Sequence, residues 1–202
     1  MDWNKAAENL VTNLPSDIIN IMSNLATVWG KECFLGGGAV RDLLLGKEIK
    51  DWDFYFPLYT QELVVSTRDI LQRLLTDDAI ITLYFSTTED DEILSTYSSY
   101  LVFNVKMTNV IPNRTLELIF SGQQISDFDH AICQCSVNCA TMELETTKWF
   151  DKCVEEKIHR IFTHNLSIPR VTHKSIHDHT KRIQKKYPWP IILETGIKYN
   201  YV

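Results

Sequence analysis

The segment Cys33–Phe56, CFLGGGAVRDLLLGKEIKDWDFYF, constrains the fold of this chain more than any other stretch. It opens with a short apolar run that leads into three glycines, 36–38, and a compact amphipathic stretch over 39–45. It closes on an Asp-Trp-Asp sequence, 51–53, followed by an aromatic tail. Glycine permits turns that other residues avoid, and strand side chains alternate between two faces. The segment therefore predicts a strand, a glycine turn, a helix, a loop and a second strand.

Two carboxylates lie in the Asp-Trp-Asp sequence. Residues two apart in a strand project to the same face, so Asp51 and Asp53 are able to converge on one cation. Mg²⁺ prefers one or two carboxylates together with water and phosphate oxygens. Glu117 is a candidate third carboxylate, because it faces away from the apolar side of a predicted strand over 115–120. The pattern favours a metal-binding face, and an exposed strand edge is the alternative. The opposite face is predicted to enter the core through Trp52, Phe54 and Phe56.

The glycine turn before the predicted helix favours phosphate binding. Gly37 and Gly38 allow close backbone approach, and the N–H groups at the start of a helix bind anions. Arg41 is suited to bidentate contact with a phosphate, and Asp42 to orienting Arg41 or accepting a ribose hydroxyl. A plain strand-to-helix turn is the alternative for the glycines, and a surface salt bridge is the alternative for Arg41 and Asp42.

The combined motif resembles a known family. GGAVRDLLLG at 37–46, followed by Asp-Trp-Asp at 51–53, is similar to the signature of the class II poly(A) polymerase and CCA-adding tRNA nucleotidyltransferase head domain. That family belongs to the DNA polymerase β-like nucleotidyltransferase superfamily. The resemblance implies a nucleotidyltransferase fold, two Mg²⁺ ions, and transfer of a nucleoside monophosphate from an NTP (ATP or CTP) with release of pyrophosphate. By matching position, it implies metal binding and catalysis by Asp51, Asp53 and Glu117, and triphosphate contacts by Gly37, Gly38 and Arg41.

Two family motifs are altered in this chain. The arginine-rich R-R-D-F-T-x-N motif has only the counterpart SDFDH at 126–130, without an arginine pair, and Asp127 or Asp129 matches its aspartate. The base-selecting E-D-x-x-R motif is echoed only by Glu156 with Arg160. An RNA 3′ end, such as that of tRNA, is the favoured acceptor. The alternatives are a nucleotidylyltransferase acting on protein, and a catalytically reduced nucleotide-binding or regulatory module of the anti-defence or toxin–antitoxin type.

Periodicity predicts the remaining elements. Helices are predicted over 16–29, 60–76, 147–157 and a segment after Pro169, and strands over 79–86, 99–107, 115–120 and 130–140. This order predicts an α+β fold with a mixed central β-sheet flanked by helices and a helical C-terminal part. We expect a nucleotidyltransferase core over 1–145 and a helical extension over 146–202 packed on the same domain.

The predicted C-terminal helix carries a basic face. Lys174, Lys181 and Arg182 are candidates for contact with NTP or acceptor phosphates, and a solvated basic face is the alternative. His173, His177 and His179 are close enough in the sequence to suggest a metal. We favour surface or phosphate-facing roles for them, because no complete ligand set is evident.

Composition limits the class of protein further. A net charge of −6 argues against a surface built for non-specific nucleic-acid binding. No apolar run approaches the roughly 20 residues that span a bilayer, and the first residues lack signal-peptide features, so we expect a cytoplasmic protein without a membrane partner. The five cysteines are predicted to be reduced. Cys133, Cys135 and Cys139 are predicted to share a buried strand face, in preference to a zinc site.

Overall fold

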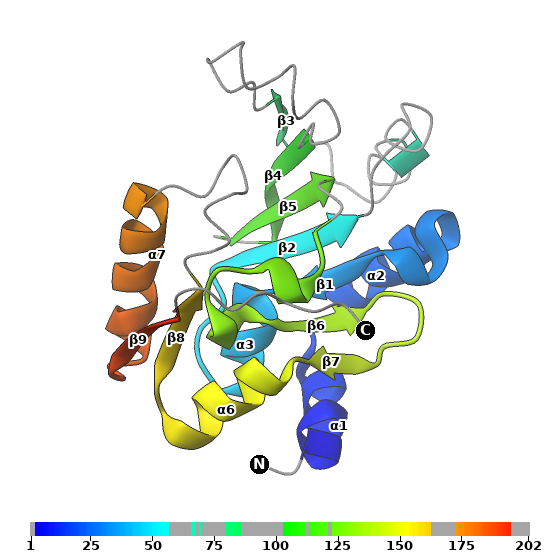
Figure 1. Cartoon of the computed structure of the whole chain (residues 1–202). Coiled ribbons are helices and arrows are strands. Elements are labelled where there is room, and N and C mark those ends of the chain that lie inside the picture. The colour runs from blue at the N-terminus through cyan, green and yellow to red at the C-terminus, as the bar shows by residue number, and fades with distance from the viewer. Residues whose placement is uncertain are drawn as a thin grey trace. The chain divides into compact units, whose positions relative to one another are not determined.

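The computed structural model describes residues 3–56, 66–67, 69, 80–85, 103–111, 114–120, 123–162 and 173–194. The chain forms two compact units. The first comprises residues 1–123 and 136–145 and is built on a seven-stranded sheet. The second comprises residues 124–135 and 146–202 and contains a two-stranded sheet with two helices (Figure 1).

The sheet of the first unit is mixed, as the sequence predicts. Its strand order is β3-β4-β5-β2-β1-β6-β7. Strands β2 and β5 run parallel, β1 pairs antiparallel with both β2 and β6, and β4 pairs antiparallel with both β3 and β5. The bounds are β1 (Phe34–Gly36), β2 (Asp51–Phe56), β3 (Ile80–Phe85), β4 (Phe103–Ile111), β5 (Arg114–Phe120), β6 (Cys135–Asn138) and β7 (Leu144–Thr146).

Helices α1 (Trp3–Asn13), α2 (Ser16–Trp29) and α3 (Gly38–Leu44) belong to the same unit, with the short 3₁₀ turn η1 (Gly30–Glu32) after α2. Helix α2 has the predicted bounds, because its apolar stripe is continuous and fully buried. Helix α1 was not predicted. Among its described side chains only Leu10 is buried, so its sequence lacks the apolar stripe that marks α2.

The core of the first unit lies against one face of β2 and β5. Their parallel register pairs Trp52 with Leu116, Phe54 with Leu118 and Phe56 with Phe120, and all six side chains are at most 1% exposed. The ring of Trp29, at the end of α2, packs 5.0 Å from Phe56 and 5.7 Å from Phe120 between centroids. Strand alternation therefore turns the carboxylates of β2 and β5 to the other face.

Three predicted segments need correction or lie outside the described residues. The predicted strand 130–140 is wrong in its first part, where the 3₁₀ turn η3 (Ala131–Cys133) precedes β6. The backbone N–H of Cys133 donates to the carbonyl of His130 at 2.8 Å, which closes a turn rather than a strand ladder. Strand β4 begins at Phe103 and extends to Ile111, four residues beyond the end of the predicted strand 99–107. The predicted helix 60–76 lies outside the described residues, except for positions 66, 67 and 69.

The second unit contains the two helices that the sequence predicts. These are α6 (Lys148–Glu156) and α7 (His173–Lys186), and the Oγ1 atom of Thr147 caps α6 by accepting from the N–H of Phe150 at 3.2 Å. The unit also contains the 3₁₀ turns η2 (Ile125–Asp127) and η3, and a parallel pair of strands, β8 (His159–Phe162) and β9 (Ile191–Glu194). These strands were not predicted. In β9, Leu193 is 60% exposed, so the strand shows no buried alternation.

All five cysteines are buried thiols outside any disulfide. Cys133 lies in η3 rather than on the predicted strand face, whereas Cys135 lies on β6 and Cys139 directly follows that strand. None of the described helices is long and apolar enough to cross a membrane.

We expect the thiols of the native protein to resist modification by 5,5′-dithiobis-(2-nitrobenzoate) at pH 8. Burial raises the pKa of Cys153 to about 11, which leaves about 0.1% of this thiol as the reactive thiolate. Absorbance of the released thiolate is the measurement. All five cysteines should react promptly in guanidinium chloride and at least about 100-fold more slowly in the native protein. One thiol that reacts natively at the denatured rate would contradict the buried arrangement.

Candidate active site

The three predicted carboxylates are placed on one face of the sheet. Asp53 on β2 and Glu117 on β5 are direct register partners in the parallel pair, and Asp51 precedes Asp53 by two residues. Neighbouring strands lie about 4.8 Å apart, so the two strands bring these side chains together from residues distant in the sequence. Asp53 and Glu117 are half-buried, and Asp51 is exposed. This arrangement offers several carboxylate oxygens on one surface.

Strand β1 forms the other flank of Asp53. Gly36 is the register partner of Asp53, and a Cβ atom added there would lie 3.1 Å from the ring of Phe34 and 3.2 Å from the ring of Tyr55. Those two rings stack with centroids 5.3 Å apart and planes 10° from parallel. Packing therefore favours glycine at this position, and the stacked pair supports the strand that carries Asp53.

The glycine turn lies immediately after β1. Gly37 has φ 66° and ψ −126°, a conformation that side chains with a Cβ rarely adopt, and it forms the N-terminal boundary of α3. The carbonyl of Gly37 accepts from the backbone N–H of Arg41 at 3.0 Å. The guanidinium of Arg41 reaches back toward Gly38, where an added Cβ would lie 3.6 Å from Nη2. The arginine therefore lies beside the turn.

Arg41 and Asp42 form a buried pair rather than a salt bridge on the helix surface. The Nε atom of Arg41 donates to Oδ1 of Asp42 at 2.7 Å, and the two residues are 5% and 3% exposed. A charge-assisted hydrogen bond between buried groups orients the guanidinium. This contact fits the predicted role of Asp42 in orienting Arg41.

The basic residues predicted to meet phosphates lie on α7, in the second unit. Lys181 and Arg182 are exposed there. Lys174 also lies within α7, but its side chain is outside the described set. His177, on the same helix, is exposed. The carboxylates and the glycine turn belong to the first unit.

The counterparts of the two altered family motifs make local contacts within the second unit. The Oδ2 atom of Asp127 accepts from the backbone N–H of Gln124 at 2.8 Å and closes η2. Arg160 donates to Oε2 of Glu156 at 2.6 Å and also to Oε1 of Glu194. Arg160 thereby links α6, β8 and β9.

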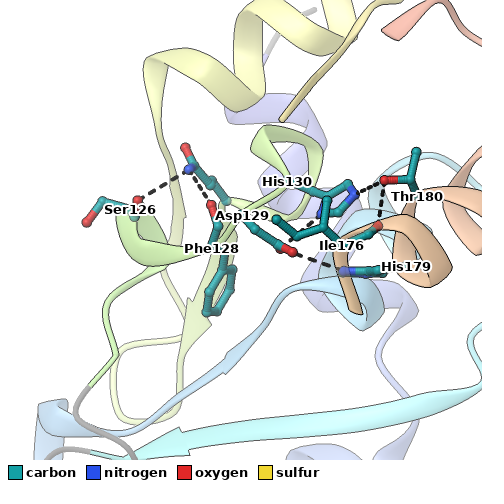
Figure 2. Close-up of polar contacts among 8 residues, drawn as sticks. Ser126, Phe128, Asp129, His130, Ile176, His179 and Thr180 are labelled. Carbon is teal, nitrogen blue, oxygen red and sulfur yellow. Dashed lines mark hydrogen bonds and ion pairs between the residues drawn. The ribbon is translucent and has the colours of Figure 1, made fainter. Parts of the chain in front are cut away.

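Asp129 lies within a cluster that sequence spacing did not reveal (Figure 2). Its Oδ1 atom is 2.9 Å from Nδ1 of His130 and 3.7 Å from Nδ1 of His179. Burial opposes ionisation of Asp129, but the two imidazoles outweigh it and hold the pKa of this carboxyl well below its usual range. Burial also acts to lower the pKa of His179, but contacts with Asp129 and Cys133 raise it to about 9. The sequence grouped His179 with His173 and His177, whereas the fold brings it to Asp129 and His130.

Comparison with known proteins identifies the family and the fold that this chain shares. The sequence model of the Poly A polymerase head domain matches residues 33–185. A Thermotoga maritima CCA-adding enzyme complexed with tRNA is similar in structure, with a TM-score of 0.62 and 15% identity over 94% of this chain and 42% of that chain. A CCA-adding enzyme with ATP gives a TM-score of 0.61 and 14% identity over 92% of this chain and 42% of that one. A comparison with curated proteins gave no significant match.

The mixed sheet flanked by helices defines a nucleotidyltransferase fold like that of the CCA-adding enzymes. Because the family model covers residues 33–185, the chain belongs to the poly A polymerase head domain family. It spans less than half the length of the structures that it resembles. At identities of 13–16%, that likeness concerns the fold alone.

Proposed function

We propose that this protein is an Mg²⁺-dependent nucleotidyltransferase that transfers a nucleoside monophosphate from ATP or CTP to the 3′-hydroxyl of an RNA such as tRNA. In this reaction the acceptor oxygen attacks the α-phosphorus, the bond from that phosphorus to the bridging oxygen breaks, and pyrophosphate leaves. Family membership supports the reaction type. The tRNA complex of a structurally similar CCA-adding enzyme supports the acceptor class.

The observation that carries the proposal is the register pairing of Asp53 with Glu117 beside Asp51. Carboxylates held together on adjacent strands repel one another, and a divalent cation removes that repulsion. Oxygen donors of this kind suit Mg²⁺ in preference to softer metals. Bound there, Mg²⁺ would neutralise charge on the triphosphate and the leaving pyrophosphate. We therefore assign the metal-binding role to Asp51, Asp53 and Glu117.

The glycine turn is proposed to receive the triphosphate. Gly37 and Gly38 keep the backbone open to a close approach, and Arg41 is held beside them by Asp42. A guanidinium oriented in advance loses little freedom when it binds a phosphate. Lys174, Lys181 and Arg182 are proposed to contact phosphates of the nucleotide or acceptor from α7. We also propose that the protein acts in the cytoplasm.

A second candidate function rests on the altered motifs. Asp127 closes η2 and Arg160 is held by Glu156 and Glu194, so these residues serve local structure in the positions that match the family motifs. A module that binds nucleotide without transferring it would retain this arrangement. Transfer to a protein hydroxyl is the other alternative. Both are distinguished from RNA transfer by a single experiment.

The experiment incubates the protein with each NTP labelled at the α-phosphate, Mg²⁺, and a mixture of total RNA and total protein. We expect label in RNA, no incorporation from γ-labelled NTP, and no reaction with EDTA, because only the α-phosphate is transferred. The matched acceptor control is the same RNA with its 3′ end oxidised by periodate, which removes the attacking hydroxyl.

Each outcome assigns a function. Label in intact but not oxidised RNA supports the proposal, and the labelled species identifies the acceptor. Label in protein would show that the acceptor is a protein hydroxyl and not RNA. Mg²⁺-dependent binding of NTP without any transfer would support the nucleotide-binding module. If neither binding nor transfer occurs, the assignment of the carboxylate face to nucleotide chemistry is wrong.

A further inference from the structure

The second unit contains a histidine, His130, that has a polar neighbour at each of its ring nitrogens. The Oγ1 hydroxyl of Thr180 donates its one proton to the carbonyl of Ile176 at 2.7 Å. Nε2 of His130 lies 2.9 Å from the same Oγ1 atom. Thr180 Oγ1 then offers Nε2 a lone pair, so the tautomer of neutral His130 that carries its proton on Nε2 satisfies both contacts. In that tautomer, Nδ1 presents a lone pair, as a metal ligand must.

Nδ1 of His130 faces the carboxylate of Asp129 (Figure 2). This nitrogen is buried and lies 2.9 Å from Oδ1 of Asp129. Two electron-rich atoms at this separation repel each other unless a cation lies between or beside them. A proton held within the cluster is one such cation, and a bound divalent metal is the other.

A third donor completes the arrangement. Nδ1 of His179 lies 3.7 Å from the same Oδ1 atom, and the ligand atoms of Asp129, His130 and His179 all lie within 4.8 Å of one another. Zn²⁺ binds imidazole nitrogen and carboxylate oxygen at about 2.0–2.2 Å, so the edges of its tetrahedron measure about 3.4 Å. The separations of 2.9 and 3.7 Å bracket that value.

We propose that Asp129, His130 and His179 form a binding site for a divalent transition metal of the Zn²⁺ class, separate from the Mg²⁺ chemistry of the carboxylate face. The hydrogen bond from His130 to Thr180 orients the imidazole, as outer contacts do for metal-binding histidines. Nitrogen donors distinguish the site from the all-oxygen donor set that suits Mg²⁺.

The site would link two distant parts of the second unit. Asp129 and His130 immediately precede η3, and His179 lies within α7, 49 residues further along the chain than His130. Cys133, in η3, contacts His179 and is a candidate for a fourth ligand. A bound metal would therefore fasten α7, with its exposed Lys181 and Arg182, to the turn that leads into β6.

The test is a Co²⁺ titration of the full chain in excess Mg²⁺, followed by displacement with Zn²⁺. Co²⁺ in a tetrahedral site absorbs visible light strongly, and excess Mg²⁺ occupies oxygen sites without competing for imidazole. We expect one Co²⁺ per chain, displaced by Zn²⁺. A charge-transfer band in the near ultraviolet that disappears in Cys133→Ser would identify the Cys133 thiolate as a further ligand of the metal.

Variants on α7 supply the matched comparison. His179→Gln should weaken metal binding by at least about 100-fold, more than the loss caused by outer contacts. His177→Gln, at an exposed position on the same helix, should bind as the wild type does. Thr180→Val should weaken binding about 10–100-fold, and Thr180→Ser should restore it. Circular dichroism confirms that each variant is folded.

Two results would overturn the proposal. One is unchanged Co²⁺ uptake in folded His179→Gln, which would place the metal elsewhere. The other is no uptake by the wild type, in which case the cluster is a buried ion pair between Asp129 and its histidines.

Discussion

Asp53→Asn should lower nucleotide transfer at least about 1,000-fold while the metal-free protein stays folded. Bound metal ions stabilise a phosphoryl-transfer transition state by several kcal/mol, and each 1.36 kcal/mol is a tenfold change in rate. Loss of about 4 kcal/mol therefore gives about a thousandfold decrease. The fold should be kept, because asparagine matches aspartate in size and the substitution removes one of the negative charges on the β2–β5 face.

The measurement combines initial transfer rates with thermal unfolding in EDTA and in Mg²⁺. Glu145→Gln is the matched control, since it removes one carboxylate from an exposed position on the edge strand β7 and should leave both quantities unchanged. Glu117→Gln should behave like Asp53→Asn. If Asp53→Asn retained more than about a tenth of the wild-type rate, the carboxylates would not be metal ligands in the reaction.

The sequence predicted the site face because the relevant signal is local. Alternation in β2 separates Asp51 and Asp53 from the aromatic side chains of the same strand, and alternation in β5 does the same for Glu117. The glycine turn and α3 follow from residues adjacent in the chain. These features needed no knowledge of which strands are neighbours.

Pairing between strands is not a local property. The parallel register that places Asp53 opposite Glu117 joins residues separated by more than 60 positions, and no pattern within either strand encodes it. The burial of Arg41 with Asp42 depends on what packs around α3, so the sequence left a surface salt bridge open. Tertiary packing determines both the register of the parallel strands and the burial of the Arg41–Asp42 pair.

In the second unit, even more of the structure depends on long-range contacts that local sequence patterns do not encode. The cluster at Asp129 unites a turn and a helix, and spacing on the helix alone grouped His179 with the wrong histidines. Strands β8 and β9 pair in parallel across an intervening helix, and the exposed residues of β9 give no strand periodicity. Long-range contacts therefore account for most of what the sequence did not predict.

Phe120→Ala should lower the free energy of unfolding by about 3–5 kcal/mol, the range found for removal of a buried aromatic ring. Phe120 is fully buried, and its ring stacks on that of its register partner Phe56 with centroids 4.5 Å apart and planes at 17°. Trp29, at the end of α2, packs against the same rings, and its indole N–H donates to Oγ1 of Thr67 at 2.7 Å. The surrounding rings therefore have little freedom to fill the cavity that Phe120→Ala would leave.

The midpoint of urea unfolding is the measurement, and for a slope of about 2 kcal/mol per molar the expected shift is about 1.5–2.5 M. Phe120→Leu, which keeps most of the apolar volume, should shift the midpoint much less. Because β5 carries Glu117 on its other face, a folded Phe120→Leu protein should also keep Mg²⁺-dependent binding of NTP. A loss below about 1 kcal/mol in Phe120→Ala would mean that the aromatic cluster does not hold the parallel pair together. In that case the position of Glu117 beside Asp53 must depend on other contacts along β2 and β5.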